Sequence, residues 1–321
     1  MANAFTGTAA MANLVQTTYD RALEFALRAQ PMFRMVADKR PVQQAMPGSS
    51  VVFEIYQDLA QATTPLNELV DPDAVAAGNP TTVSVTLNEY GNSILVSNKL
   101  DLFSFTDVTA GLVNQVAWNL VDSIDLVVQN VLAAGTQVIR QNGDPASVAP
   151  IYNGGTTAAV QPGSIYSSQA ARLAVAKLRA QKVHPNKGSF YTTYIHPEVS
   201  HDLRAETGNA AWRDPHNYSA AGNIWAGEIG EYEGSVFIET PRCQNALNAG
   251  TTPTRVFQTY TTGQQALAEA VAEEFHTVRG PVVDKLTRFQ PLGWYGVAGW
   301  SLYRPEALIR TETTSSIHDI T

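Results

Sequence analysis

The stretch that most constrains the fold is TDVTAGLVNQVAWNLVDSIDLVVQNVLAAG, which runs from Thr106 to Gly135. Apolar side chains recur in it every three or four residues, as on one side of an α-helix: Val108, Leu112, Val116, Leu120, Ile124, Val127 and Val131. Thr106 or Asp107 can cap its start, and Gly135 supplies a stop. At about 1.5 Å per residue this helix is roughly 40 Å long, more than most helices of globular domains. We expect it to act as a rigid strut.

Two β-strands are predicted before this helix. Ser50–Ile55 (SVVFEI) and Thr81–Leu87 (TTVSVTL), the second continuing through Gly91 into SILVS, are rich in Val, Ile and Thr. The connection between them, residues 56–80, is polar and acidic and contains Pro65. It is too long for a hairpin turn and unusual inside a compact domain. We therefore expect a long loop with a function of its own.

The charged residues are few and unevenly distributed. Of the 321 residues 44% are hydrophobic and only 16% are charged, against roughly 25% charged in an average soluble protein, so we expect much of the surface to face other subunits. The net charge is -8, and residues 41–139 carry ten acids against one base, Lys99. Between Pro41 and Asn98 there is no Lys or Arg, and six acids occur: Glu54, Asp58, Glu68, Asp71, Asp73 and Glu89. Such an asymmetry concerns partners rather than the fold.

The rest of the chain follows an α+β pattern. An amphipathic helix is predicted over residues 14–29, followed by a basic stretch with Arg34, Lys39 and Arg40. A second helix, residues 167–181, has a basic face that continues just beyond its end: Arg172, Lys177, Arg179 and Lys182. Strands are predicted over 189–195, 235–239, 255–261, 282–286 and 296–302, and further helices over 198–206 and 264–274.

Several classes of protein are excluded. No run approaches the eighteen or so apolar residues of a membrane-spanning helix, and the N-terminus has no basic start followed by an apolar run. The single cysteine, Cys243, cannot form a disulfide within the chain. The acidic balance argues against a protein whose main task is to grip nucleic-acid phosphates. Because no such apolar run occurs, we expect no membrane association.

No catalytic, cofactor or metal site is predicted. In the best metal candidate, residues 196–201 (HPEVSH), the histidines are five apart and Pro197 interrupts, unlike the helical HExxH pattern. Asp71 and Asp73 suggest calcium, but an EF-hand loop needs a glycine where Ala76 stands. An α+β metal-dependent hydrolase using His196, Glu198, His201 and Asp202 is the weakest of the functional hypotheses.

The glycines and aromatic residues near the C-terminus have structural explanations. Gly293, Gly296 and Gly299 have the wrong spacing for a dinucleotide site, and we expect them to relieve crowding in a sheet or turn. Four aromatic residues in the same region suggest either a stacking platform for bases or packing within a sheet or subunit interface: Trp294, Tyr295, Trp300 and Tyr303. Few Lys or Arg residues cluster nearby, which favours packing.

The order of these elements resembles that of tailed-phage major capsid proteins with the HK-ninety-seven-like fold. Residues 177–206 (KLRAQKVHPNKGSFYTTYIHPEVSHDLRAE) are similar to the family's helix, strand and His-Pro step before a short helix. Residues 230–243 (GEYEGSVFIETPRC) resemble its glycine-led strand ending in a proline. Residues 281–313, with the turn Pro305-Glu306-Ala307, resemble the terminal strands of the N-four-type branch.

The resemblance implies an α+β chain in five parts. These are an N-terminal helix and arm (1–49), an extended β-hairpin loop (50–98), a spine helix with the first part of a peripheral domain (99–150), an axial α+β domain (151–275) and returning strands of the peripheral domain (276–321). It further implies a non-enzymatic protein without cofactors, which forms hexamers and pentamers of an icosahedral head.

The partners implied are other copies, a portal protein, and packaged double-stranded DNA bound without sequence specificity. For scaffolding, a separate protein or none is implied, and decoration proteins are optional. The implied location is the virion, after assembly in the host cytoplasm. An encapsulin-type nanocompartment shell is the alternative on the same fold.

The charge pattern fits a contact between subunits. An isolated two-stranded ribbon is marginal in water, so the predicted hairpin needs a neighbour. Its six acids are expected to meet bases of adjacent subunits, and the candidates are Arg34, Lys39, Arg40 and the basic helix of residues 167–181. Each exposed pair contributes little, but repetition around closed rings can define the register.

Overall fold

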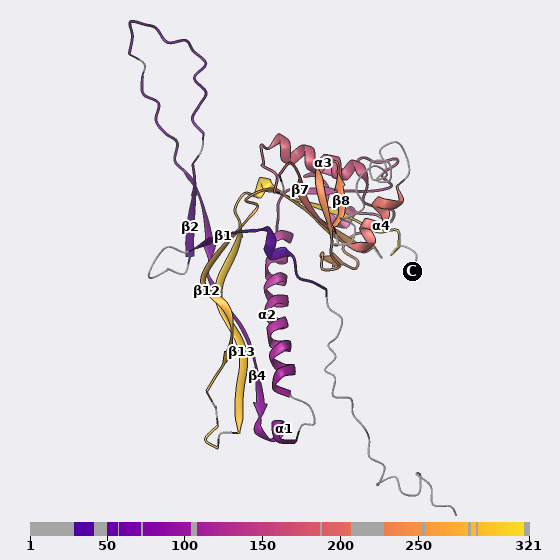
Figure 1. Ribbon diagram of the computed structural model, residues 1–321. Coiled ribbons are helices and arrows are strands. Elements are labelled where there is room, and N and C mark those ends of the chain that lie inside the picture. Colours follow the sequence, from indigo (N-terminus) through magenta and orange to yellow (C-terminus); the bar gives the residue numbers. More distant parts are fainter. Residues whose placement is uncertain are drawn as a thin grey trace, which may run out of the picture.

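The computed structural model of the chain (Figure 1) describes residues 29–41, 50–56, 58–71, 73–103, 108–186, 188–206, 228–251, 254–281, 284–286 and 288–317. The helix predicted over residues 14–29 lies outside these ranges except for Ala29, and the predicted caps Thr106 and Asp107 also lie outside them. Within the described ranges no helix is both long and apolar enough to cross a membrane.

The long helix and a four-stranded sheet form an elongated unit. The helix, α2 (Val108–Ala133), is confirmed and lies along one face of the sheet (Figure 1). The strand order is β1 (Ala37–Pro41), β12 (Leu267–Arg279), β13 (Phe289–Leu302) and β4 (Asn88–Ser97). β1 pairs with β12 in parallel, and the other pairs are antiparallel. The N-terminal arm therefore supplies an edge strand to a sheet built mainly from the end of the chain.

The middle of the apolar stripe of α2 packs against aromatic side chains of β13. Val116 and Ile124 share a core cluster with Trp294 and Trp300. The indole N–H of Trp294 donates to Asn119 Oδ1 of α2 at 2.9 Å, so its one polar group is satisfied. Burial of each large apolar side chain contributes ~1.5–3 kcal/mol, and this contact therefore holds the helix on the sheet.

Glycines in β13 make room for this packing. A Cβ atom at Gly296 would overlap the ring of Phe275 on β12, which stacks on Trp300 with 6.1 Å between ring centroids. At Gly293 and Gly299 a Cβ atom would overlap the backbone of a neighbouring strand. The expectation that these glycines relieve crowding in a sheet is confirmed.

A second, eight-stranded sheet forms a separate layered unit. Its order is β6-β5-β14-β11-β7-β9-β8, with β10 also paired to β11. The strands are β5 (Val138–Arg140), β6 (Ile151–Tyr152), β7 (Tyr191–Ile195), β8 (Glu228–Tyr232), β9 (Ser235–Glu239), β10 (Asn245–Ala246), β11 (Val256–Thr262) and β14 (Leu308–Thr313). The helices α3 (Ser168–Ala180) and α4 (Pro197–Ala205) belong to this unit, as predicted. Short 3-10 helices occupy Phe33–Val36, Thr157–Ala159 and Pro305–Ala307.

A two-stranded ribbon, β2 (Ser50–Ile55) and β3 (Thr81–Thr86), carries the long loop. Its strands pair antiparallel from Ser50 opposite Thr86 to Ile55 opposite Thr81. Val85 is buried in a small cluster with Ala268 and Ala270 of β12 and with Tyr303. Because β12 is covered by α2 on one face and by the ribbon on the other, small side chains are needed where the ribbon crosses it.

The strand predicted from Thr81 through Gly91 into Ser97 is divided at Leu87. β3 ends at Thr86 and pairs with β2, whereas β4 begins at Asn88 and pairs along its whole length with β13. The ribbon is therefore shorter than the hairpin expected over residues 50–98. Alternating Val and Thr residues predict strands but do not identify the partner strand.

Three other predictions in the C-terminal half differ from the structure. The helix predicted over residues 264–274 is wrong, because most of this segment is the start of β12; its Ala and Glu residues favour helices, but pairing with β1 and β13 overrides that propensity. The strand predicted over 282–286 is wrong for Asp284–Leu286, which lie in a turn before β13. β14 returns to the eight-stranded sheet between β5 and β11, so the sheets do not follow the expected ranges 151–275 and 276–321.

An ion-pair network centred on the buried carboxylate of Asp125 joins the two units and the N-terminal arm. Arg242, which follows β9, donates from Nε to Asp125 Oδ2 at 2.7 Å and from Nη1 to Asp122 Oδ1 at 2.5 Å. The backbone N–H of Phe33 donates to Asp125 Oδ1 at 2.7 Å. Burial alone lowers the pKa of Arg242, but hydrogen bonds and charge from the two aspartates raise it overall. The guanidinium therefore stays charged and holds α2, the arm and the eight-stranded unit together.

A second network anchors the C-terminal end of α2. Glu312 on β14 is 1% exposed and accepts from Arg140 Nε at 2.8 Å and from Thr157 Oγ1 at 2.8 Å. It also pairs with Arg310 at 3.0 Å, and Arg310 donates to the carbonyl oxygen of Ala133, at the last turn of α2. The helix and the eight-stranded unit are thus joined by two ion-pair networks, each with one nearly fully buried carboxylate, Asp125 and Glu312.

We predict that Arg242→Ala destabilises the protein by about 3 kcal/mol, because it leaves the Asp125 carboxylate buried without its cation. The measurement is urea unfolding of the unassembled protein. The matched control is Arg288→Ala, which removes an exposed pair with Asp284 and is expected to cost less than about 1 kcal/mol. Equal losses in the two variants would contradict this role for Arg242.

Gly296→Ala is expected to lower the free energy of unfolding by about 1–3 kcal/mol, because its methyl group would collide with Phe275 inside the sheet. Gly78→Ala is the control, since no atom lies within 4 Å of a Cβ there. Its effect should stay within about 0.5 kcal/mol. Denaturation midpoints that shift alike would show that the close packing at Gly296 has no energetic importance.

Candidate subunit interface

The loop between β2 and β3 is exposed along its described length. Residues 58–71 and 73–79 are all exposed, and Figure 1 shows the loop projecting away from both sheets. Four of the predicted interface acids lie on it: Asp58, Glu68, Asp71 and Asp73. None of these four carboxylates forms an ion pair within the described part of the chain.

Large apolar side chains share the loop with these acids. Leu69 is 91% exposed, Leu66 78% and Val75 73%, and Leu59 and Val70 are exposed as well. The sequence prediction rested on the charges and missed these residues, although the Leu and Val content of the loop was visible. An exposed mixture of acidic and apolar side chains without partners in its own chain is typical of a surface that contacts another molecule.

The other two predicted acids lie on strands. Glu54 on β2 is exposed and accepts a hydrogen bond from the Tyr56 hydroxyl at 3.4 Å. Glu89 on β4 is exposed and lies near Tyr295 of β13. Desolvation first, and then the negative charges of Glu89 and Glu273, raise the pKa of the Tyr295 hydroxyl. The six acids thus occupy the loop, the ribbon and the four-stranded sheet rather than one cluster.

Two of the predicted basic partners are engaged within their own chain. Arg34 pairs with Glu269 of β12 at 2.5 Å and lies 3.8 Å from Glu274, and Lys39 pairs with Glu274. Glu269 is almost completely buried. Arg40 lies in β1, and its side chain is outside the described part. The sequence analysis did not identify Glu269 and Glu274 as partners of the arm, because it predicts a helix over residues 264–274. The parallel pairing of β1 with β12 brings both acids to the arm.

The remaining predicted bases lie on α3 and in the turn after it. Arg172, Arg179 and Lys182 are exposed, and Lys177 is half-buried. Arg172 Nε lies 3.9 Å from Glu233 Oε1, a loose contact. Within one chain, the bases of α3 form no ion pair with Glu68, Asp71 or Asp73 of the loop among the described residues.

The residues behind the metal-dependent hydrolase hypothesis serve the fold. His196 caps α4, because its Nδ1 accepts the backbone N–H of Glu198 at 3.3 Å. Asp202 is buried and accepts the N–H of Ser316 at 2.9 Å, which ties the end of the chain to α4. His201 is exposed beside Asp202. In the described ranges no group of three or more His, Cys, Asp or Glu side chains is placed to hold a metal ion.

The chain matches one family of known proteins in sequence. Residues 129–306 match the family model described as phage capsid protein. No curated protein sequence matches the chain. The matched residues include most of the eight-stranded unit and the strands β12 and β13, which are the parts that pack against α2.

Solved phage structures share the fold over nearly the whole chain. The capsid of Ralstonia phage GP4 is similar with a TM-score of 0.72 at 13% identity, covering 94% of this chain and 96% of that one. The acid-stable capsid of Helicobacter pylori bacteriophage KHP30 gives 0.71 at 12% identity, covering 98% and 99%. Mycobacterium phage Che8 gives 0.63 at 15% identity, covering 93% and 97%. The chain therefore belongs to the phage capsid protein family, and it is a major capsid protein with the HK-ninety-seven-like fold.

Proposed function

We propose that copies of this chain assemble as hexamers and pentamers into an icosahedral phage head that encloses double-stranded DNA. As a capsid protein it is a structural component of the virion. The observation that carries the proposal is the exposed loop of residues 58–79, whose acidic and apolar side chains have no partners among the described residues. Contact with a second copy would bury the apolar side chains of this loop and give its carboxylates partners.

The physical basis of assembly is repetition. A single exposed ion pair contributes at most about 1 kcal/mol, and a few leucines buried at a contact add ~1.5–3 kcal/mol each before the cost of association. In a closed ring every copy makes the same contact twice, once with each neighbour. Weak contacts therefore suffice when each copy is held in many of them.

The remaining partners belong to the same proposal. A portal protein, separate scaffolding and decoration proteins, and assembly in the host cytoplasm are consistent with a shell that is filled with DNA. The net charge of -8 favours confinement of DNA without tight or sequence-specific binding, since phosphate contacts need Lys and Arg.

An encapsulin-type shell remains the alternative on this fold. The family match is to phage capsid protein, and nothing in the comparisons favours a nanocompartment. Expression of the protein alone and together with its scaffolding protein tests the proposal, with electron microscopy of the product. Rings or closed shells are the expected result, and a protein that stays monomeric at high concentration in both preparations would overturn it.

We predict that replacing residues 58–79 by an Asn-Gly turn leaves a folded, soluble protein that no longer forms shells. β2, β3 and the buried Val85 are retained, so the thermal midpoint should change by only a few degrees. A second variant carries Gly and Ser in place of residues 58–79 at unchanged length. It should also fail to assemble, because it lacks the acidic and apolar side chains. Shells from either variant as stable as those of the parent would contradict the role of the loop.

A further inference from the structure

Two stretches of the chain carry opposite charge. Residues 42–97 contain six acids and no base, whereas residues 145–197 contain no acid and five bases: Arg172, Lys177, Arg179, Lys182 and Lys187. Most acids of the first stretch lie on the exposed loop, and the described bases of the second lie on α3 and the turn after it. Opposite charges gathered on two exposed surfaces of one chain favour contact between copies.

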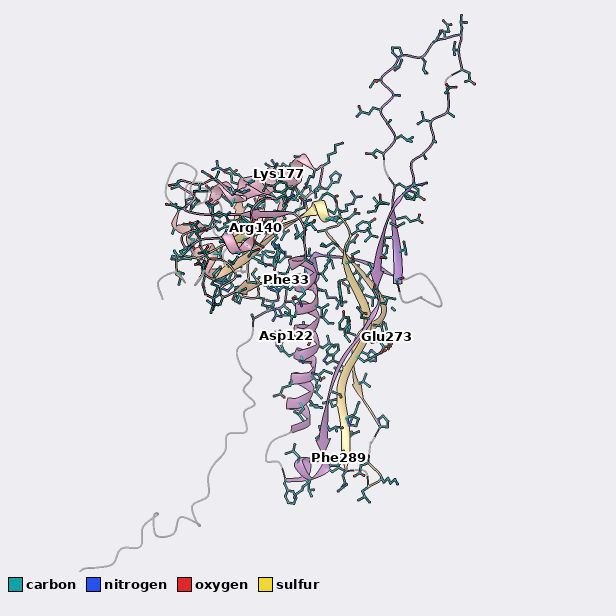
Figure 2. All side chains as sticks on the ribbon, turned by 180° about the vertical axis from the view of Figure 1, so that it is seen from behind. Phe33, Asp122, Arg140, Lys177, Glu273 and Phe289 are labelled. Carbon is teal, nitrogen blue, oxygen red and sulfur yellow. The ribbon has the colours of Figure 1, made fainter. Side chains whose placement is uncertain are left out.

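The small apolar residues of helix α3 are buried, and its bases lie on the other side, where Arg172 and Arg179 are exposed and Lys177 is half-buried. The buried side consists of Ser168, Ala170, Ala171, Ala174, Val175 and Leu178. On the other side Lys177 Nζ lies 4.6 Å over the ring of Tyr152, and Figure 2 shows Lys177 at the outer edge of the eight-stranded unit. No carboxylate of the described residues forms an ion pair with Lys177, Arg179 or Lys182. Near the C-terminal end of a helix the macrodipole also favours positive charge.

An open cleft adjoins this basic end of α3. It has a volume of about 800 Å³, and its charged and titratable lining consists of Lys182, His184, Arg304 and Glu306 and, from the ribbon side, Asp58. The chain's own loop reaches the cleft at its base with Asp58, while its tip projects away from the eight-stranded unit (Figure 1). The cleft and the adjoining bases are therefore open to a segment from another molecule.

Other bases are less suited to receive the acidic loop. Arg34 and Lys39 already pair with acids of β12. At the far end of the four-stranded sheet Arg288 pairs with Asp284 at 2.6 Å. Lys99 and Lys285 are exposed there, Lys99 on the short helix α1 (Asn98–Phe103). Two isolated lysines offer less complementary charge than the bases of α3, and they supply a matched control.

We propose that the acidic loop of one copy, residues 58–73, docks on the basic end of α3 and the adjoining cleft of a second copy. This inference rests on the proposed self-assembly and names its contact surface. The carboxylates of Glu68, Asp71 and Asp73 meet Lys177, Arg179 and Lys182 of the neighbour. The guanidinium of Arg179 can bind a carboxylate through two N–H groups, whereas the lysines act as point charges. Because the pairs are exposed, assembly should weaken as salt is raised.

The test is a charge exchange between the two surfaces of the full-length protein. Lys177→Glu with Lys182→Glu, and separately Asp71→Lys with Asp73→Lys, should each raise the protein concentration needed for half-maximal assembly about tenfold. The variant with all four substitutions should recover most of the loss, because the pairs re-form with reversed sign. Lys99→Glu with Lys285→Glu is the control and should leave assembly unchanged. Light scattering measures assembly, and thermal midpoints check that each variant is folded.

The outcomes separate this inference from the proposed function. Assembly that fails for the parent protein, with and without scaffolding protein, overturns the proposed function and the docking with it. A parent that assembles while the two reversals act alone but do not compensate each other overturns only the docking. If Lys99→Glu with Lys285→Glu impairs assembly instead, the loop contacts the far end of the neighbour's four-stranded sheet, which overturns docking on α3. If the α3 reversal reduces binding of duplex DNA but not assembly, the basic surface belongs to DNA, which also overturns the docking.

Discussion

The buried carboxylate of Asp125 connects more of this structure than any other single group described above. It receives the guanidinium of Arg242 from the eight-stranded unit and the backbone N–H of Phe33 from the arm, while it belongs to α2 itself. Burying a charge costs several kcal/mol unless it is paired and hydrogen-bonded. The three segments are therefore held together at one point, and the rigid helix transmits that constraint along the four-stranded sheet.

The few charged residues of this chain act in two places. On the loop between β2 and β3, exposed acids have no described ion-pair partner in the chain. However, several bases are used inside the molecule: Arg34, Arg140, Arg242 and Arg310 pair with the buried acids Glu269, Asp125 and Glu312. The pairs of Arg34 with Glu269, Arg140 with Glu312 and Arg242 with Asp125 join segments that are distant in sequence, so these charges organise the chain before any partner is bound.

The elements that were predicted well are those with strong local signals. The spacing of apolar residues identified α2, and Val-rich or aromatic runs identified β2, β7, β9 and β11. The misses lie where local preference conflicts with pairing. Residues 264–274 have the composition of a helix, yet β12 is a strand because β1 and β13 flank it. That error also concealed Glu269 and Glu274 as the partners of Arg34 and Lys39, and so left these bases as candidates for the loop.

The sequence alone determined that a long helix, a long acidic loop and an α+β arrangement exist, because periodicity, turn residues and charge counts are local properties of the chain. The pairing of the strands, the return of β14 to the eight-stranded sheet and the neutralisation of particular charges became visible in the folded chain. Those facts depend on contacts between residues that are distant in sequence, such as Phe33 with Asp125 on α2, 92 positions apart, and Asp125 with Arg242, 117 positions apart. Burial of a charged group is tolerated only where such a partner compensates its loss of water, and no local pattern records which residues are buried together.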